Sequence, residues 1–266
     1  MGKQGGVAGM KVFEGIRGVL IDLEGVLYVG EQVIEGAVDT IDWLSEHQIP
    51  HRFVTNTTTQ SRDDLSRKMK ALGFPAEPGD ILSTPAAAAA YLRQQQLHSC
   101  FLAVSEAIRD EFQEFACVET APDAVVIGDI GKDWDYDLVN HIAQMVMAGA
   151  QLVALHKGKF WQTDEGLRVD IGAFVAGIEY VTGGEARVIG KPSAAFFQAG
   201  IEALQCPAEN ILMIGDDIES DVAGAQRCGM KGALVRTGKF RQEQLATSEI
   251  LPDAVLDSIA ELPCYL

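Results

Sequence analysis

The stretch GVLIDLEGVLY, residues Gly18–Tyr28, decides how the rest of the chain is interpreted. Its apolar run Val19–Ile21 is short and continuous, which is typical of a strand covered on both faces of a sheet. The run ends on Asp22, and Glu24 and Gly25 follow. Because glycine enters turn conformations without steric cost, Gly25 permits the chain to turn directly after the second carboxylate. The stretch therefore predicts a buried strand that presents two carboxylates at its end.

Strands and helices alternate downstream of this stretch. Apolar residues at helical spacing predict helices at 37–47, 61–72, 196–204 and 222–228. Short apolar runs predict further strands at 52–54, 186–189, 211–214 and 232–235. Strands that alternate with helices imply a parallel sheet joined by right-handed crossovers. Ligands bind at the carboxyl ends of the strands in such sheets, so the polar residues that follow these strands are the candidate site.

A second alternating stretch lies between the two halves of this pattern. Strands are expected there at 101–104, 124–127 and 152–155, and helices at 107–115 and 136–148. Proline at Thr84-Pro85 and paired glycine at Thr182–Gly184 are suited to hinges. The predicted fold is α/β, a Rossmann-like doubly wound parallel-sheet core with an inserted α/β domain. The predicted division is core residues 1–83, inserted domain 84–183 and core residues 184–266.

The overall charge of the 266-residue chain limits its partners. The formal net charge is −17, which works against nucleic acid and anionic membrane surfaces as partners. No segment holds eighteen unbroken apolar residues, and the five cysteines are scattered without C-x-x-C spacing. We therefore expect a soluble cytoplasmic protein with reduced thiols and no zinc site, which binds neither nucleic acid nor membrane.

Four polar pieces follow predicted strands. They are Asp22 with Glu24, Thr55 with Asn56, Lys191 in a Gly-Lys-Pro sequence, and the group Asp216, Asp217 and Asp221. Taken singly, each has a structural explanation, because such residues commonly cap helices or form turns. Taken together they suit phosphoryl transfer. Asp22 and Asp216 can offer oxygen ligands to a divalent cation, and Thr55 and Lys191 can hold phosphoryl oxygens. A carboxylate can also attack phosphorus, and Asp22 is the predicted nucleophile.

The order of these motifs resembles that of the haloacid dehalogenase superfamily of hydrolases. Within it, the chain resembles subfamily IIA, which carries a large α/β cap of the C2 type inserted after the second motif. The sequences GDDI at 215–218, GAQRCGM at 224–230 and VRTGKFR at 235–241 most resemble the phospholysine phosphohistidine inorganic pyrophosphate phosphatase group. The resemblance extends from Gly18 to about Arg241 and identifies the inserted domain as a cap.

The resemblance implies a role for each candidate residue. Asp22 is the nucleophile, and Mg²⁺ is held by Asp22, the backbone carbonyl of Glu24 and Asp216. Phosphate contacts come from Thr55 and Lys191, and Asn56 helps to position the phosphoryl group. Asp221 orients metal-bound water or the lysine, and Asp217 is an outer residue without a clear role. The resemblance also suggests a homodimer through the cap.

Glu24 departs from the pattern of the superfamily, where the second carboxylate of this motif is usually an aspartate that serves as general acid and base. The added methylene moves the carboxyl by about 1.5 Å, and misplacement of about 1 Å can cost about 100-fold in rate. Two interpretations remain open. Glu24 is either a catalytic acid and base, or it offers only its backbone carbonyl while its side chain turns away. Weakened acid catalysis would favour leaving groups that need little protonation, such as pyrophosphate, acyl phosphates and phosphoramidates.

The function that these residues predict is Mg²⁺-dependent hydrolysis of a small phosphorylated metabolite through an aspartyl-phosphate on Asp22. A large cap excludes bulk water and argues for a small substrate. The alternative is a phospho-ligand binding protein that has lost efficient turnover, because Glu24 replaces the usual aspartate. A signalling receiver module is disfavoured by the order of the motifs, since Asp216 and its neighbours follow the lysine. A phosphotransferase is conceivable, but nothing in the sequence selects an acceptor.

Overall fold

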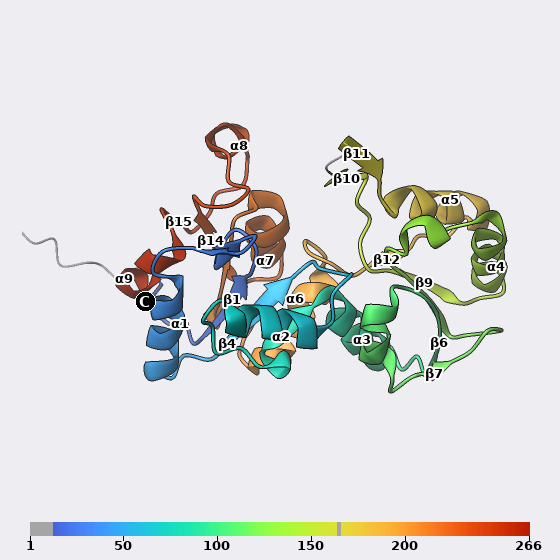
Figure 1. Cartoon of the computed structure of the whole chain (residues 1–266), viewed down its shortest axis with the longest axis horizontal. Helices are drawn as coiled ribbons and strands as arrows, with labels where there is room; N and C mark the ends of the chain where they lie inside the picture. Colours follow the sequence, from blue (N-terminus) through green and yellow to red (C-terminus); the bar gives the residue numbers. More distant parts are fainter. Residues whose placement is uncertain (1–12, 164–165) are drawn as a thin grey trace, which may run out of the picture. The chain divides into compact units, whose positions relative to one another are not determined.

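The computed structural model describes residues 13–163 and 166–266 (Figure 1). The chain divides into two compact units. Unit 1 gathers the chain up to Val54 together with Met69–Pro75 and Ile201–Leu266, and unit 2 gathers Thr55–Lys68 and Ala76–Gly200. Among the described residues, no helix has the length and apolar character that crossing a membrane requires.

The first sheet has the strand order β15-β14-β13-β1-β4-β5. Its strands are β1 (Gly18–Asp22), β4 (His51–Thr55), β5 (Ile81–Ser83), β13 (Ile211–Gly215), β14 (Lys231–Val235) and β15 (Ala254–Leu256). Strand β1 pairs in parallel with β13 on one side and with β4 on the other. Because the chain proceeds from β1 toward β4 and returns on the other side as β13, the β1/β13 boundary is the switch point of the sheet.

The central strand is apolar because both of its faces are covered. Val19, Leu20 and Ile21 are completely buried, as the continuous apolar run predicts. Helices follow in the expected places along the chain: α1 (Ala37–Glu46), α2 (Arg62–Ala71), α6 (Ala194–Leu204) and α7 (Gly224–Arg227). Two helices that the sequence analysis did not predict follow them, α8 (Gln242–Thr247) and α9 (Leu262–Tyr265). At the start of α2, the Ser61 and Asp64 side chains each accept a hydrogen bond from the other residue's backbone N–H, which is a capping box.

The second sheet lies in unit 2 and has the order β12-β9-β8-β6-β7, with every pair parallel. Its strands are β6 (Ser99–Ala103), β7 (Ala116–Cys117), β8 (Ala124–Ile127), β9 (Gln151–Ala154) and β12 (Arg187–Val188). The helices of this unit include α3 (Thr84–Gln94), α4 (Tyr136–Met147) and α5 (Gly172–Thr182). Side chains of β6, β8 and β9 pack with those of α4 and α5 in one apolar core. Two parallel sheets with covering helices confirm the predicted α/β class.

The strand expected at 186–189 forms, but its place in the fold was predicted wrongly. We assigned it to the first sheet, whereas β12 pairs with β9 and extends the second sheet. Val188 packs against the apolar core of unit 2, which explains why the strand joins that sheet. The division at residues 84 and 184 stays a prediction.

Two short hairpins complete the described structure. Strands β2 (Tyr28–Val29) and β3 (Gln32–Val33) pair antiparallel directly after the stretch that opens the fold. Strands β10 (Phe160–Thr163) and β11 (Gly166–Val169) form a second antiparallel pair in unit 2. The first of these hairpins bears on the candidate site, because it lies next to Glu24 in the sequence.

Candidate active site

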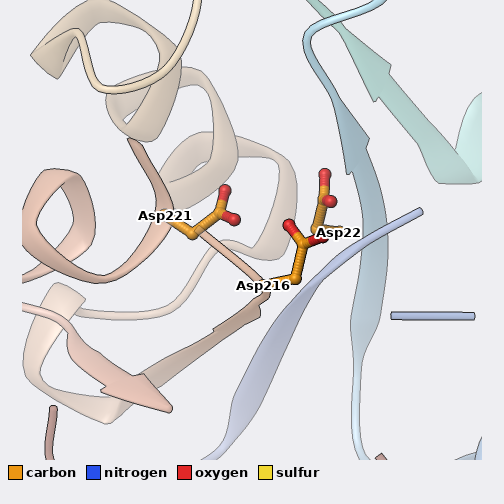
Figure 2. A group of neighbouring side chains, drawn as sticks. All are labelled: Asp22, Asp216 and Asp221. Atoms are coloured by element: carbon orange, nitrogen blue, oxygen red, sulfur yellow. The ribbon is translucent and has the colours of Figure 1, made fainter. Parts of the chain in front are cut away.

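Three buried carboxylates meet at the end of the first sheet (Figure 2). One oxygen of each of Asp22, Asp216 and Asp221 lies within 4.8 Å of the other two. The residues are 7%, 2% and 1% exposed, respectively. Carboxylates this close and this shielded from water repel one another, and a cation removes the repulsion. A set of three carboxylates is also the oxygen-rich environment that Mg²⁺ prefers.

The parallel pairing of β1 with β13 brings the first two carboxylates together. Ile21 pairs with Ile214, so Asp22 and Asp216 come directly after paired positions at the ends of neighbouring strands. Asp221 comes from the next segment, the short π-helical turn η5 (Ile218–Ala223). Its Oδ2 accepts a hydrogen bond of 3.2 Å from the backbone N–H of Asp217, which fixes the carboxylate beside the strand end.

Three glycines let the backbone pass very close to this cluster. A Cβ atom at Gly25 would lie 1.9 Å from Oδ2 of Asp216, and one at Gly238 would lie 2.1 Å from the same oxygen. That oxygen accepts a hydrogen bond of 2.7 Å from the backbone N–H of Lys239. A Cβ atom at Gly215 would lie 2.2 Å from Oδ2 of Asp221. The backbone thus approaches the carboxylates as only glycine allows. The three carboxylates and the glycine backbone around them form a cradle that fits a divalent cation.

Replacing Gly25 with alanine is expected to damage this cradle. The new methyl group would displace the Asp216 carboxylate, and the backbone angle φ of +90° disfavours any residue with a Cβ. We expect a loss of at least about 100-fold in phosphatase activity, because misplacement of about 1 Å has that effect, and about 1–3 kcal/mol of stability.

Gly149→Ala is the matched control for Gly25→Ala. Gly149 also has a positive φ, of +113°, but nothing lies within 4 Å of its added Cβ. This variant should lose about 1 kcal/mol in a thermal or urea denaturation curve and retain its activity. Equal activity losses in the two variants would contradict the role of Gly25.

Glu24 directs its carboxylate to the first hairpin. The residue is exposed, and its Oε1 accepts a hydrogen bond of 2.8 Å from the backbone N–H of Gly30. Tyr28 lies close by and is 2% exposed. Burial raises the pKa of the Tyr28 phenol, and the negative charges of Glu24 and Asp22 raise it further. The phenol therefore stays protonated at neutral pH. Whether Glu24 offers its backbone carbonyl to a metal stays a prediction.

The predicted phosphate-binding residues lie in unit 2. Thr55 is the last residue of β4, is 6% exposed, and has its Oγ1 3.0 Å from Oγ1 of Thr57. Lys191 is 8% exposed. The side-chain amide of Asn56 accepts from the Lys191 backbone N–H at 2.8 Å and donates to the Lys191 carbonyl at 3.0 Å. These contacts make Asn56 a positioning residue for the lysine loop, and a direct contact with a phosphoryl group stays a prediction.

The group after β13 divides into two roles. Asp217 caps η5, because its Oδ1 accepts hydrogen bonds of 3.0 Å from the backbone N–H groups of Glu219 and Ser220. That contact is the helix-capping explanation that sequence reasoning offers for any such aspartate. Asp221, expected only to orient water or the lysine, belongs to the carboxylate cluster itself.

Sequence reasoning did not single out Tyr28, Gly238 or the backbone N–H of Lys239 as parts of the site. Gly238 and Lys239 fall within the sequence VRTGKFR, which was noted only for its resemblance to a family. Their proximity to Asp216 depends on β14 lying beside β13. No local pattern signals such proximity, since it arises from strand order.

Comparison with known proteins identifies relatives over nearly the whole chain. A family model described as haloacid dehalogenase-like hydrolase matches residues 19–117, and a HAD-hydrolase-like model matches residues 188–262. The human phospholysine phosphohistidine inorganic pyrophosphate phosphatase is 36% identical over 258 residues, which cover 94% of each chain. The mouse haloacid dehalogenase-like hydrolase domain-containing protein 2 is 37% identical over 227 residues, covering 85% of this chain and 86% of that protein.

Solved structures show the same fold. The 4-nitrophenylphosphatase of Thermotoga maritima has a TM-score of 0.84 at 25% identity and covers 94% of this chain and 97% of its own. The p-nitrophenyl phosphatase of Archaeoglobus fulgidus has a TM-score of 0.86 at 23% identity and covers 94% of this chain and 99% of its own. The second likeness concerns the fold alone.

Proposed function

The chain belongs to the haloacid dehalogenase-like hydrolase family and is a phosphohydrolase, and from this premise we propose that it hydrolyses a small phosphorylated substrate through Asp22 with Mg²⁺ as cofactor. The observation that carries the proposal is the buried cluster of Asp22, Asp216 and Asp221. Asp22 and Asp216 would hold the cation, with Asp221 beside them. When bound, Mg²⁺ would supply positive charge that offsets the negative charge of the carboxylates and the phosphoryl group.

Asp22 is the nucleophile in the proposed reaction. One of its carboxylate oxygens attacks phosphorus, the bond from phosphorus to the leaving group breaks, and an aspartyl-phosphate forms. Water then attacks that phosphorus, releases inorganic phosphate and restores the carboxylate. Thr55 and Lys191 would contact the phosphoryl oxygens, with the backbone of Lys191 held by Asn56.

The substrate class follows from the acid catalysis that Glu24 can give. Its Oε1 accepts a hydrogen bond from the backbone N–H of Gly30 in the hairpin, which holds this carboxylate in place. We infer that the preferred substrates are those whose leaving groups depart with little protonation. Pyrophosphate, acyl phosphates and phosphoramidates protonated on nitrogen fit this description. The name of the human relative includes pyrophosphate, and it includes phospholysine and phosphohistidine, which are phosphoramidates.

A series of phosphate esters tests this inference. Activity should fall by about 100-fold or more from an acidic phenol to a simple alcohol as leaving group, because general acid catalysis is worth about 100-fold to 10,000-fold. Glu24→Gln keeps the acceptor for Gly30 but cannot transfer a proton. It should retain activity on p-nitrophenyl phosphate within about threefold, as measured by nitrophenolate release.

Two outcomes would contradict the role given to Glu24. Equal rates across acidic and poor leaving groups would show that protonation is supplied efficiently. A loss of about 100-fold in Glu24→Gln on poor leaving groups would show that this carboxylate supplies it.

The proposed function is tested by a screen of small phosphorylated compounds. Pyrophosphate, phosphoramidates and sugar phosphates are incubated with the full chain, and phosphate release is measured with Mg²⁺ and with a chelator. Mg²⁺-dependent turnover is the expected result. Saturable binding without release of phosphate would instead support the alternative of a binding protein that has lost turnover.

A further inference from the structure

Two of the five cysteines face each other across neighbouring strands of unit 2. Strands β6 and β7 run in parallel, and their register places Cys100 opposite Cys117. Strand β7 is the edge of its sheet. Residues that pair across neighbouring strands lie about 4.8 Å apart and project from the same face, which falls within the Cα separations that disulfides span.

The two thiols differ in their access to solvent. Cys100 is buried and Cys117 is exposed. Burial raises the pKa of the Cys100 thiol to about 12, and the hydrogen-bonded side chain of Cys117 adds to the effect. Cys100 therefore stays protonated at neutral pH. The exposed member of the pair is the one that a dissolved oxidant meets first.

Both cysteines line one cavity of about 350 Å³ in unit 2. Arg109, Glu119 and Asp133 line the same cavity, so it is polar as well as open to small molecules. The other three cysteines, Cys206, Cys228 and Cys264, belong to unit 1. Cys100 and Cys117 thus share one cavity that a small oxidant can enter.

We propose that Cys100 and Cys117 are a reversible dithiol–disulfide pair, oxidised by a hydroperoxide that enters this cavity. The Cys117 sulfur attacks the peroxide, the O–O bond breaks, and Cys117 becomes a sulfenic acid while the peroxide is reduced to an alcohol or water. The Cys100 sulfur then attacks the sulfenic sulfur. The S–S bond forms, water leaves with the proton of Cys100, and a dithiol reductant reverses the reaction.

Oxidation of the full-length protein with hydrogen peroxide tests this assignment. Thiol titration under denaturing conditions should fall from five free cysteines to three, and the intact mass should fall by two hydrogen atoms. Proteolysis without reduction should yield a peptide that links Cys100 to Cys117. Dithiothreitol should restore all five thiols.

Variants separate the pair from other oxidation. Cys117→Ser changes an exposed position, and Cys100→Ala keeps a buried position apolar; each should abolish the linked peptide. Circular dichroism melts establish that both variants fold. The control Cys264→Ser removes an exposed cysteine of unit 1 and should leave the link intact. Two results would overturn the proposal: oxidation of Cys117 to a sulfinic acid, or a disulfide between the Cys117 residues of two chains, in either case with Cys100 still a thiol.

Discussion

Asp22→Asn is expected to lower phosphate release from p-nitrophenyl phosphate by at least about 1,000-fold, because an amide oxygen cannot replace the carboxylate as nucleophile. Asp22 ends the buried strand β1 and is 7% exposed, so it projects from a rigid support. The change keeps the size of the side chain and removes one of three clustered negative charges. The fold should therefore survive, and denaturation curves of variant and native chain will show whether it does.

The matched control for this variant is Asp39→Asn, an exposed position in α1 of the same unit. It should retain full activity. Acid quenching during turnover distinguishes a nucleophile from a metal ligand, because the peptide that contains Asp22 should then carry a phosphoryl group. Water attacks phosphorus at the second step, so this group leaves as inorganic phosphate and Asp22 keeps its own oxygens. Substantial turnover by Asp22→Asn would exclude the proposed route.

Asp216→Asn is expected to remove the response to Mg²⁺, both in activity and in stability. A ligand at 100 times its dissociation constant stabilises a folded protein by about 2.7 kcal/mol, and the variant should lose most of that gain. Without metal the variant should be more stable than the native chain, because one of three mutually repelling buried carboxylates is gone. Activity should fall by about 100-fold or more, as expected when a cation that stabilises transferring charge is lost.

Melting temperatures with and without Mg²⁺ test this expectation independently of activity. Asp42→Asn, which changes an exposed carboxylate of α1, is the control and should respond to Mg²⁺ as the native chain does. An undiminished Mg²⁺ response in Asp216→Asn would mean that the cation binds elsewhere. A chelator should lower the melting temperature of the native chain and leave that of Asp216→Asn nearly unchanged.

Much of the site was predictable because the carboxyl ends of the strands lie together in a parallel α/β sheet. The apolar run before Asp22 and the run before Asp216 each predicted a buried strand, and both strands form. Once the sheet is parallel, the carboxyl ends lie at one edge. The capping box at Ser61 and Asp64 was predictable for a simpler reason, since its partners are three residues apart.

Other features depended on contacts that no local pattern encodes. Asp217 and Asp221 look alike in the sequence, yet one caps a helical turn and the other joins the carboxylate cluster. The strand near Val188 has the composition of any buried strand, and only its packing places it in the second sheet. The direction of the Glu24 side chain depends on where the hairpin presents the Gly30 N–H.

The sequence by itself determined the class of fold and the family, because hydrophobic periodicity and motif order are properties of the chain read in one dimension. It also determined which carboxylates stand at strand ends. Only the tertiary structure decided that Asp221 lies with Asp22 and Asp216, that Gly25 and Gly238 shape the space around them, and that Cys100 faces Cys117. The physical reason is that strand order and register bring together residues that are far apart in the chain. The local sequence pattern around each residue does not indicate which distant residues become its neighbours.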